Sequence, residues 1–178
     1  MKKLILSSAI LAVLGVTSTA MAAPNTGTVN FTGVVTSATC DISLKDKANQ
    51  DVSNVDFGSV SNANLNATYE FKLVAQSQEC LEKSSANVSW SSPTLGSSGI
   101  ANAAGTGGTN AYLKVQATNA TQKGDDSIIK RGQTSFDYNE AKGGIASFDY
   151  TATLAGPVKG DLTAGPFNAS ASYVVAYK

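Results

Sequence analysis

The feature that most constrains the fold is a series of short segments in which apolar and polar residues alternate. These segments recur between residues 28 and 177 and are separated by Gly, Pro, Asn and Ser, at a spacing of about ten residues. A period of two places every second side chain on the same face of a β-strand. No segment has the periodicity of an amphipathic helix of four turns. Strands at this spacing are typical of a β-sandwich or a β-barrel.

The alternation predicts strands over residues 28–37, 55–60, 69–73, 87–90, 111–117, 136–138, 145–154 and 165–177, with a further short strand at 127–129. Gly58 interrupts the second of these strands and predicts a bulge or a close approach of backbone. The Gly-rich segment 96–109 is predicted to be a loop. Trp90 closes a strand after Val88, which favours a position in the core over a role as a sugar-stacking platform.

The first 22 residues have the features of a secretory signal peptide. Lys2 and Lys3 precede an apolar run over residues 4–16, and Ala20 and Ala22 form an A-x-A cleavage site. The alternative is a transmembrane anchor, for which the apolar run is too short. We therefore expect cleavage after Ala22 and export of the chain.

The chain contains two cysteines, Cys40 and Cys80. An even number of cysteines in an exported chain predicts one disulfide. Closing a loop of this length is worth about 4 kcal/mol in the chain-entropy model. The alternatives are a pair of free thiols or a two-ligand metal site without histidine.

Composition argues against catalysis and against nucleic-acid binding. The formal net charge is zero, so the chain lacks the excess of basic residues typical of nucleic-acid-binding proteins. His is absent, which excludes Ser-His and Cys-His catalytic pairs and imidazole metal ligands. Asp125 and Asp126 are adjacent and would point apart on a strand, so we interpret them as solvated loop charges. Asp46, Asn49 and Asp51 lack the spacing of a calcium loop. We expect no enzyme activity, no metal and no cofactor.

The two ends of the mature chain carry the most specific information. Val29, Phe31, Gly33 and Val35 share one face of the first predicted strand, and Phe167, Ala169, Ala171, Tyr173, Val175 and Tyr177 share one face of the last. Alternation alone describes two ordinary strands of a sandwich. The segment GTVNFTGVV before Cys40, a penultimate Tyr177 and a Gly165 fourteenth from the end together resemble the pilin subunits of enterobacterial chaperone–usher fimbriae.

This resemblance implies an all-β, incomplete immunoglobulin-like sandwich of six strands that lacks its seventh. Residues 23–39 would be an N-terminal extension carrying the donor strand, and residues 40–178 the pilin domain. Val29, Phe31, Gly33 and Val35 would enter the groove of the next subunit, with Gly33 at a shallow pocket. The groove wall, which would also bind the chaperone, is expected to comprise Gly165, Phe167, Ala171, Tyr173, Val175, Tyr177 and Lys178, the last supplying the terminal carboxylate.

The resemblance also implies a structural subunit that polymerises head to tail by donor-strand complementation into a surface fibre for adhesion to host cells. Its partners would be identical or related subunits, a periplasmic chaperone and an outer-membrane usher. The alternative is a main subunit that itself binds a host glycan, such as an acidic sugar, through Lys123, Lys130 and Arg131. The simpler interpretation of those three residues is a variable surface loop.

Overall fold

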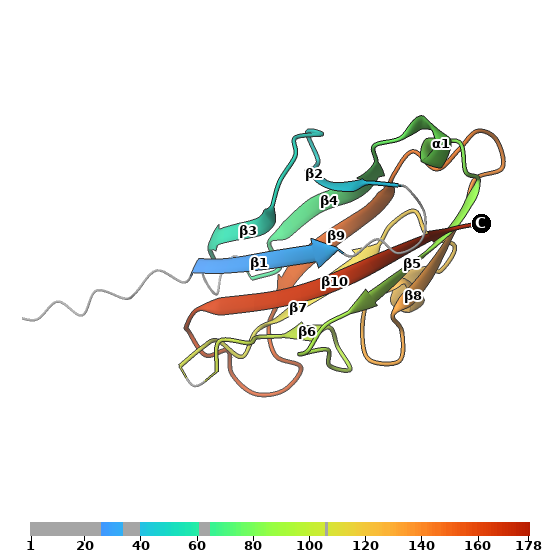
Figure 1. Cartoon of the computed structure of the whole chain (residues 1–178). Helices are drawn as coiled ribbons and strands as arrows, with labels where there is room; N and C mark the ends of the chain where they lie inside the picture. The colour runs from blue at the N-terminus through green and yellow to red at the C-terminus, as the bar shows by residue number, and fades with distance from the viewer. Residues whose placement is uncertain (1–25, 34–39, 61–64, 106) are drawn as a thin grey trace, which may run out of the picture.

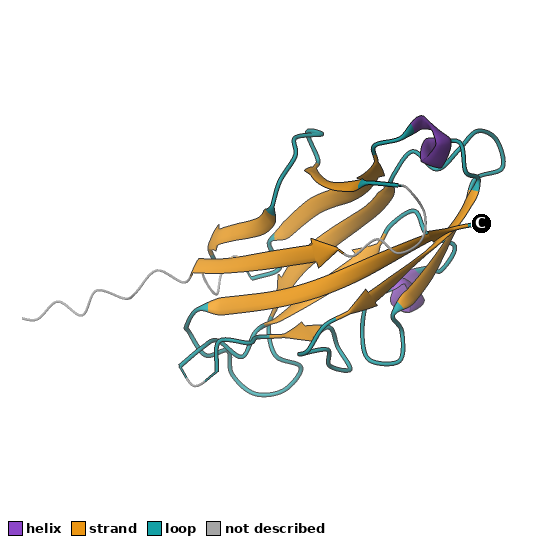
Figure 2. Ribbon diagram, in the orientation of Figure 1, coloured by secondary structure: helices purple, strands orange, loops and turns teal. Residues whose placement is uncertain are grey.

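Strands form nearly all of the regular structure in the computed structural model of the chain, which describes residues 26–33, 40–60, 65–105 and 107–178 (Figure 2). The predicted signal peptide and the last part of the predicted donor strand, including Val35, lie outside the described residues. In the described part of the chain, no helix is long and apolar enough to cross a membrane.

The strands form two sheets of five. The first contains, in spatial order, β3 (Asn54–Ser59), β1 (Thr26–Gly33), β10 (Phe167–Tyr177), β5 (Ser85–Ser91) and β8 (Ser135–Asn139). The second contains β2 (Ile42–Asp46), β4 (Thr68–Ala75), β9 (Phe148–Ala155), β7 (Tyr112–Ala117) and β6 (Ile100–Ala101). One helical turn, α1 (Gln78–Leu81), connects β4 to β5. The predicted immunoglobulin-like sandwich is confirmed.

The N-terminal strand β1 lies between β3 and β10 of its own chain (Figure 1). It runs parallel to β10, whereas every other strand pair described is antiparallel. The resemblance implies an open groove beside the last strand. In this structure, β1 of the same molecule occupies that position.

An aromatic cluster joins the two sheets. Trp90 of β5 is 4% exposed, which confirms its predicted core position, and its ring meets that of Tyr150 on β9 edge to face at 5.1 Å. The Trp90 Nε1–H donates to the Tyr150 hydroxyl at 3.2 Å. The Tyr138 hydroxyl of β8 donates to the same oxygen at 2.7 Å. Phe71 of β4 stacks on Tyr150 at 5.2 Å. Tyr150 thus holds both sheets together through its ring and its hydroxyl.

The structure differs from the prediction at three places. The short strand predicted at 127–129 is reduced to one antiparallel bridge between Ile128 and Gln116 of β7. A 3₁₀ helix over Gly124–Ser127 takes its first residue, and the Ser127 hydroxyl closes that helix by donating to the Gly124 carbonyl at 2.7 Å. The strand β2 was not predicted, because only its central residue, Leu44, is buried and the pattern is weak. The loop predicted over residues 96–109 contains the two-residue strand β6.

We predict that Tyr150→Phe lowers the free energy of unfolding by about 1–3 kcal/mol, because two buried donors, on Trp90 and Tyr138, lose their acceptor. Urea denaturation measures the loss. Tyr112→Phe on the outward face of β7 is the matched control and should change stability by less than about 0.5 kcal/mol. Equal effects of the two substitutions would contradict this role for Tyr150.

We also predict that stability falls as the pH rises above about 10, the ordinary pKa of tyrosine. Burial raises the pKa of Tyr138 and Tyr150, and it raises the pKa of Tyr177 to about 12. These phenols stay protonated in the folded chain while the unfolded chain releases its protons. Their contribution is therefore complete below pH 10 and is lost toward higher pH. Urea titrations from pH 8 to 11 test this, and a Tyr150→Phe variant should show a smaller decline.

Candidate functional site

The candidate site is the slot between β3 and β10 that β1 occupies. The backbone of β1 pairs with β10 from Gly27 opposite Phe167 to Gly33 opposite Tyr173. On its other edge β1 pairs antiparallel with β3, from Thr26 opposite Ser59 to Asn30 opposite Asn54. Since β3 has no other partner in this sheet, removal of β1 would leave β3 and β10 facing each other across an open gap.

The apolar wall of the slot comes from β10 and β3. Every second residue of β10 from Phe167 to Val175 is buried, and the residues between them are more exposed. Val55 of β3 is fully buried opposite them. Five predicted groove residues, Gly165, Phe167, Ala171, Tyr173 and Val175, therefore lie on or directly before the strand that borders the slot.

The glycine in β3 produces the predicted bulge. The register between β1 and β3 shifts between Thr26 and Thr28, where three steps along β3 oppose two steps along β1. Gly58 has a φ of 60°, and its N–H donates to the Asp56 carboxylate at 2.8 Å. A positive φ with an open outer side fits a bulge at the edge of a sheet.

The C-terminal end of β10 packs against the disulfide. Cys40 and Cys80 form the predicted disulfide, with a Cα–Cα distance of 6.0 Å, and both are buried. Tyr177 packs on this pair and on Phe148, and its buried hydroxyl has no hydrogen-bond partner among the described residues. Lys178 is exposed, with its Nζ 3.7 Å from the Asp137 carboxylate. The disulfide thereby fixes the point at which the N-terminal segment joins the domain.

The residues predicted to contact a glycan lie along one turn region. Lys123 directly precedes the 3₁₀ helix, and Lys130 forms an isolated bridge with Gln133. The Arg131 guanidinium donates to the Leu95 carbonyl at 3.2 Å. None of the three lines either cleft described next.

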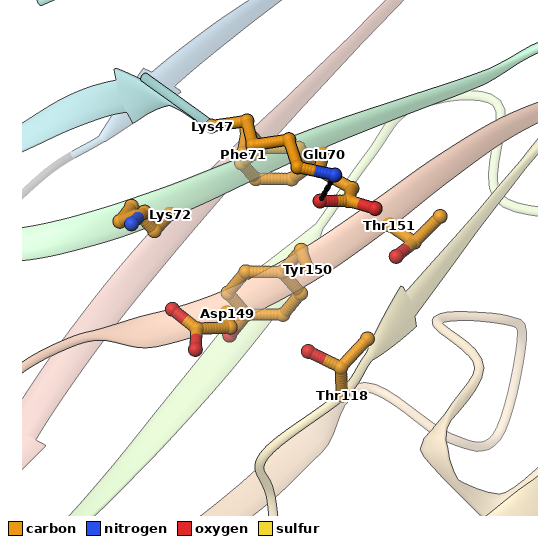
Figure 3. A pocket seen from close by; sticks show the side chains of 8 residues that line it. All are labelled: Lys47, Glu70, Phe71, Lys72, Thr118, Asp149, Tyr150 and Thr151. Atoms are coloured by element: carbon orange, nitrogen blue, oxygen red, sulfur yellow. Dashed lines mark ion pairs between the residues drawn. The ribbon is translucent and has the colours of Figure 1, made fainter. Parts of the chain in front are cut away.

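A polar cleft of about 320 Å³ lies on the outer face of β4 and β9 (Figure 3). The Lys47 ammonium pairs with the Glu70 carboxylate at 2.9 Å along one side, and Thr118 and Asp149 line the other. A second hollow shares Lys72 with it. The sequence did not predict this cleft, although the polar residues that alternate along β4 and β9 line it. Two lysines balance two carboxylates, so the cleft favours no ligand charge.

Within the described residues, no group of three or more His, Cys, Asp or Glu is placed to hold a metal ion.

Comparison with known proteins decides the family. A family model described as "Fimbrial protein" matches residues 29–178. The K99 fimbrial protein of Escherichia coli is 33% identical over 169 residues, which cover 90% of this chain and 91% of the relative. The chain belongs to the fimbrial protein family. This fimbrial subunit is therefore a structural component of a surface fibre, and the match begins inside β1.

Gly165 of the fimbrial subunit meets a neighbouring loop too closely for a side chain. Its φ is 151°, and a Cβ there would lie 2.5 Å from the Gly107 carbonyl oxygen and 2.9 Å from the Thr109 nitrogen. The glycine fourteenth from the end is thus required by backbone contact at the start of β10.

We predict that Gly165→Ala lowers the free energy of unfolding by at least about 1 kcal/mol more than Gly160→Ala, because overpacking adds to the cost of the backbone conformation. Gly160 has a φ of 81° and open space at its Cβ, so it isolates the backbone term. Thermal or urea unfolding compares the two variants. Equal losses would show that the contact with the Gly107 loop yields freely.

Proposed function

We propose that this fimbrial subunit polymerises by strand exchange. The N-terminal segment leaves the slot of its own chain and enters the slot of a neighbour, while another neighbour supplies the replacement. The observation that carries the proposal is the position of β1, which completes the first sheet between β3 and β10. Residues 34–39 are the covalent connection between β1 and the elements that follow it in the chain. An interface of this head-to-tail kind does not close and yields a filament.

The energetics of the exchange favour reuse of the same slot. Backbone pairing along both edges of β1 contributes hydrogen bonds that any strand of compatible length can make. Side chains then select the register, because a slip of one residue turns every side chain to the other face. In the predicted donor register, Val29 and Phe31 supply apolar surface worth about 1.5–3 kcal/mol each when fully buried.

A subunit whose slot is not filled by β1 would need the partners that the resemblance implies. An open edge beside buried apolar residues promotes aggregation. We therefore include in the proposal a periplasmic chaperone that fills the slot with a strand of its own, grips the carboxylate of Lys178, and delivers the subunit to an outer-membrane usher. The mature chain would begin after the signal peptide, at Ala23.

Adhesion to host cells is the use that we propose for the resulting fibre. A polymer repeats any weak binding surface many times, which raises avidity without new contacts. Direct glycan contact by Lys123, Lys130 and Arg131 stays a prediction of the sequence.

We predict that Gly33→Leu and Phe31→Asp abolish polymerisation but preserve binding to the chaperone. The leucine side chain is too large for a shallow pocket, and the aspartate replaces the largest apolar group of the donor with a charge. Periplasmic expression with the chaperone, followed by gels of unheated samples, measures both properties. SDS-resistant ladders should fall at least about tenfold, as expected for a loss beyond 1.4 kcal/mol.

Thr32→Leu is the matched control, because it adds a side chain of the same size at the neighbouring position with the opposite alternation. It should leave the ladders close to those of the unmodified chain. Normal assembly of Gly33→Leu and Phe31→Asp would refute the donor assignment.

A further inference from the structure

The first half of β10 has an edge that no strand of the described residues covers. β5 pairs with β10 only from Ser172 to Tyr177, and β1 takes the opposite edge from Phe167 to Tyr173. Residues 167–171 are therefore bordered by β1 on one side alone. On the other side lies the loop that follows β6. This loop decides whether the first half of β10 keeps its shape when the slot is empty.

The side chain of Asn102 fastens this loop to β10. Its Nδ2 donates to the Thr109 carbonyl at 2.7 Å and to the Pro166 carbonyl at 2.8 Å. Its Oδ1 accepts from the Ala104 N–H at 2.9 Å and from the Asn168 N–H at 2.9 Å. Both donors and both acceptor positions of the amide are thus used.

Backbone contacts reinforce the same attachment. The Ala103 N–H donates to the Asn168 carbonyl at 2.7 Å, so Asn168 is bonded to the loop through both of its backbone groups. The fit around the amide is tight, because a Cβ on Gly108 would lie 2.6 Å from the Asn102 Nδ2. We call Asn102 and its four backbone partners the Asn102 clamp.

We infer that Asn102 is a positioning residue for strand exchange, holding residues 167–171 extended so that their opposite edge, which faces the slot, can receive an incoming strand. The inference rests on the proposed function and deepens it. The clamp lies on the same edge of β10 as β5, on the N-terminal side of Ser172, where β5 no longer pairs. This edge points away from the slot, so the clamp can persist while strands are exchanged. Its contribution is local to the first half of β10.

Hydrogen exchange on the full mature chain tests the clamp without polymerisation. In Asn102→Ala, amides of residues 167–171 and 26–33 should exchange about tenfold faster, as expected when several hydrogen bonds that hold this part of β10 are lost together. Amides of residues 173–177, which β5 covers, should change less than twofold, by about 0.4 kcal/mol or less.

Asn119→Ala is the matched control. Asn119 also fastens a loop through both ends of its amide, donating to the Ser147 carbonyl at 2.9 Å and accepting from the Asp149 N–H at 2.8 Å, but it lies in the loop that follows β7 of the second sheet. It should leave residues 167–171 unchanged. Where Asn102→Ala fails to fold, Asn102→Asp keeps the acceptor for Asn168 and loses the two donors, and an intermediate effect is expected.

Fibre dissociation supplies the functional measurement. Fibres of Asn102→Ala should release subunits in SDS about tenfold faster than fibres of Asn119→Ala at matched monomer stability. Unchanged exchange at 167–171 together with equal dissociation would overturn the clamp. If the unmodified chain forms no strand-exchanged fibre, the proposed function fails while hydrogen exchange still decides the role of Asn102.

Discussion

The backbone pairing of one strand with two others that cannot reach each other is the interaction on which the structure depends. β3 and β10 face the same slot, and β1 alone joins them into a sheet. The slot between β10 and β3 is lined by the buried row of β10 and by the buried side chain of Val55. Because the bonds that fill it are mostly between backbones, the strand can come from the same chain or from another.

The rest of the sandwich does not depend on the slot to the same degree. The aromatic cluster around Tyr150, the second sheet and the buried disulfide all lie within residues 40–178. In the proposed strand exchange, this core would stay with the subunit while β1 leaves it. A fibre built in this way keeps each subunit folded and still links it to its neighbours through a complete β-sheet.

The sequence predicted the elements whose signal is local. Alternation located β10 with the correct inward residues, the glycine of β3 predicted a bulge, and Trp90 was placed in the core. The signal failed where distant residues decide the structure. β2 exists because it pairs with β4, and two of the four hydrogen bonds of Asn102 join residues more than sixty positions apart. Alternation also identified β1 as a strand but could not say that it lies parallel to β10 in its own chain.

The most direct measurement is strand replacement in a nicked subunit. A protease site placed within residues 34–39 would separate β1 from the folded chain without removing it, and native mass spectrometry would then follow an isotopically heavy peptide with the sequence of residues 26–33. The account predicts that one heavy peptide replaces each resident strand and that protection of β3 and β10 from hydrogen exchange is retained. A nicked chain that loses β1, binds no peptide and keeps that protection would contradict it.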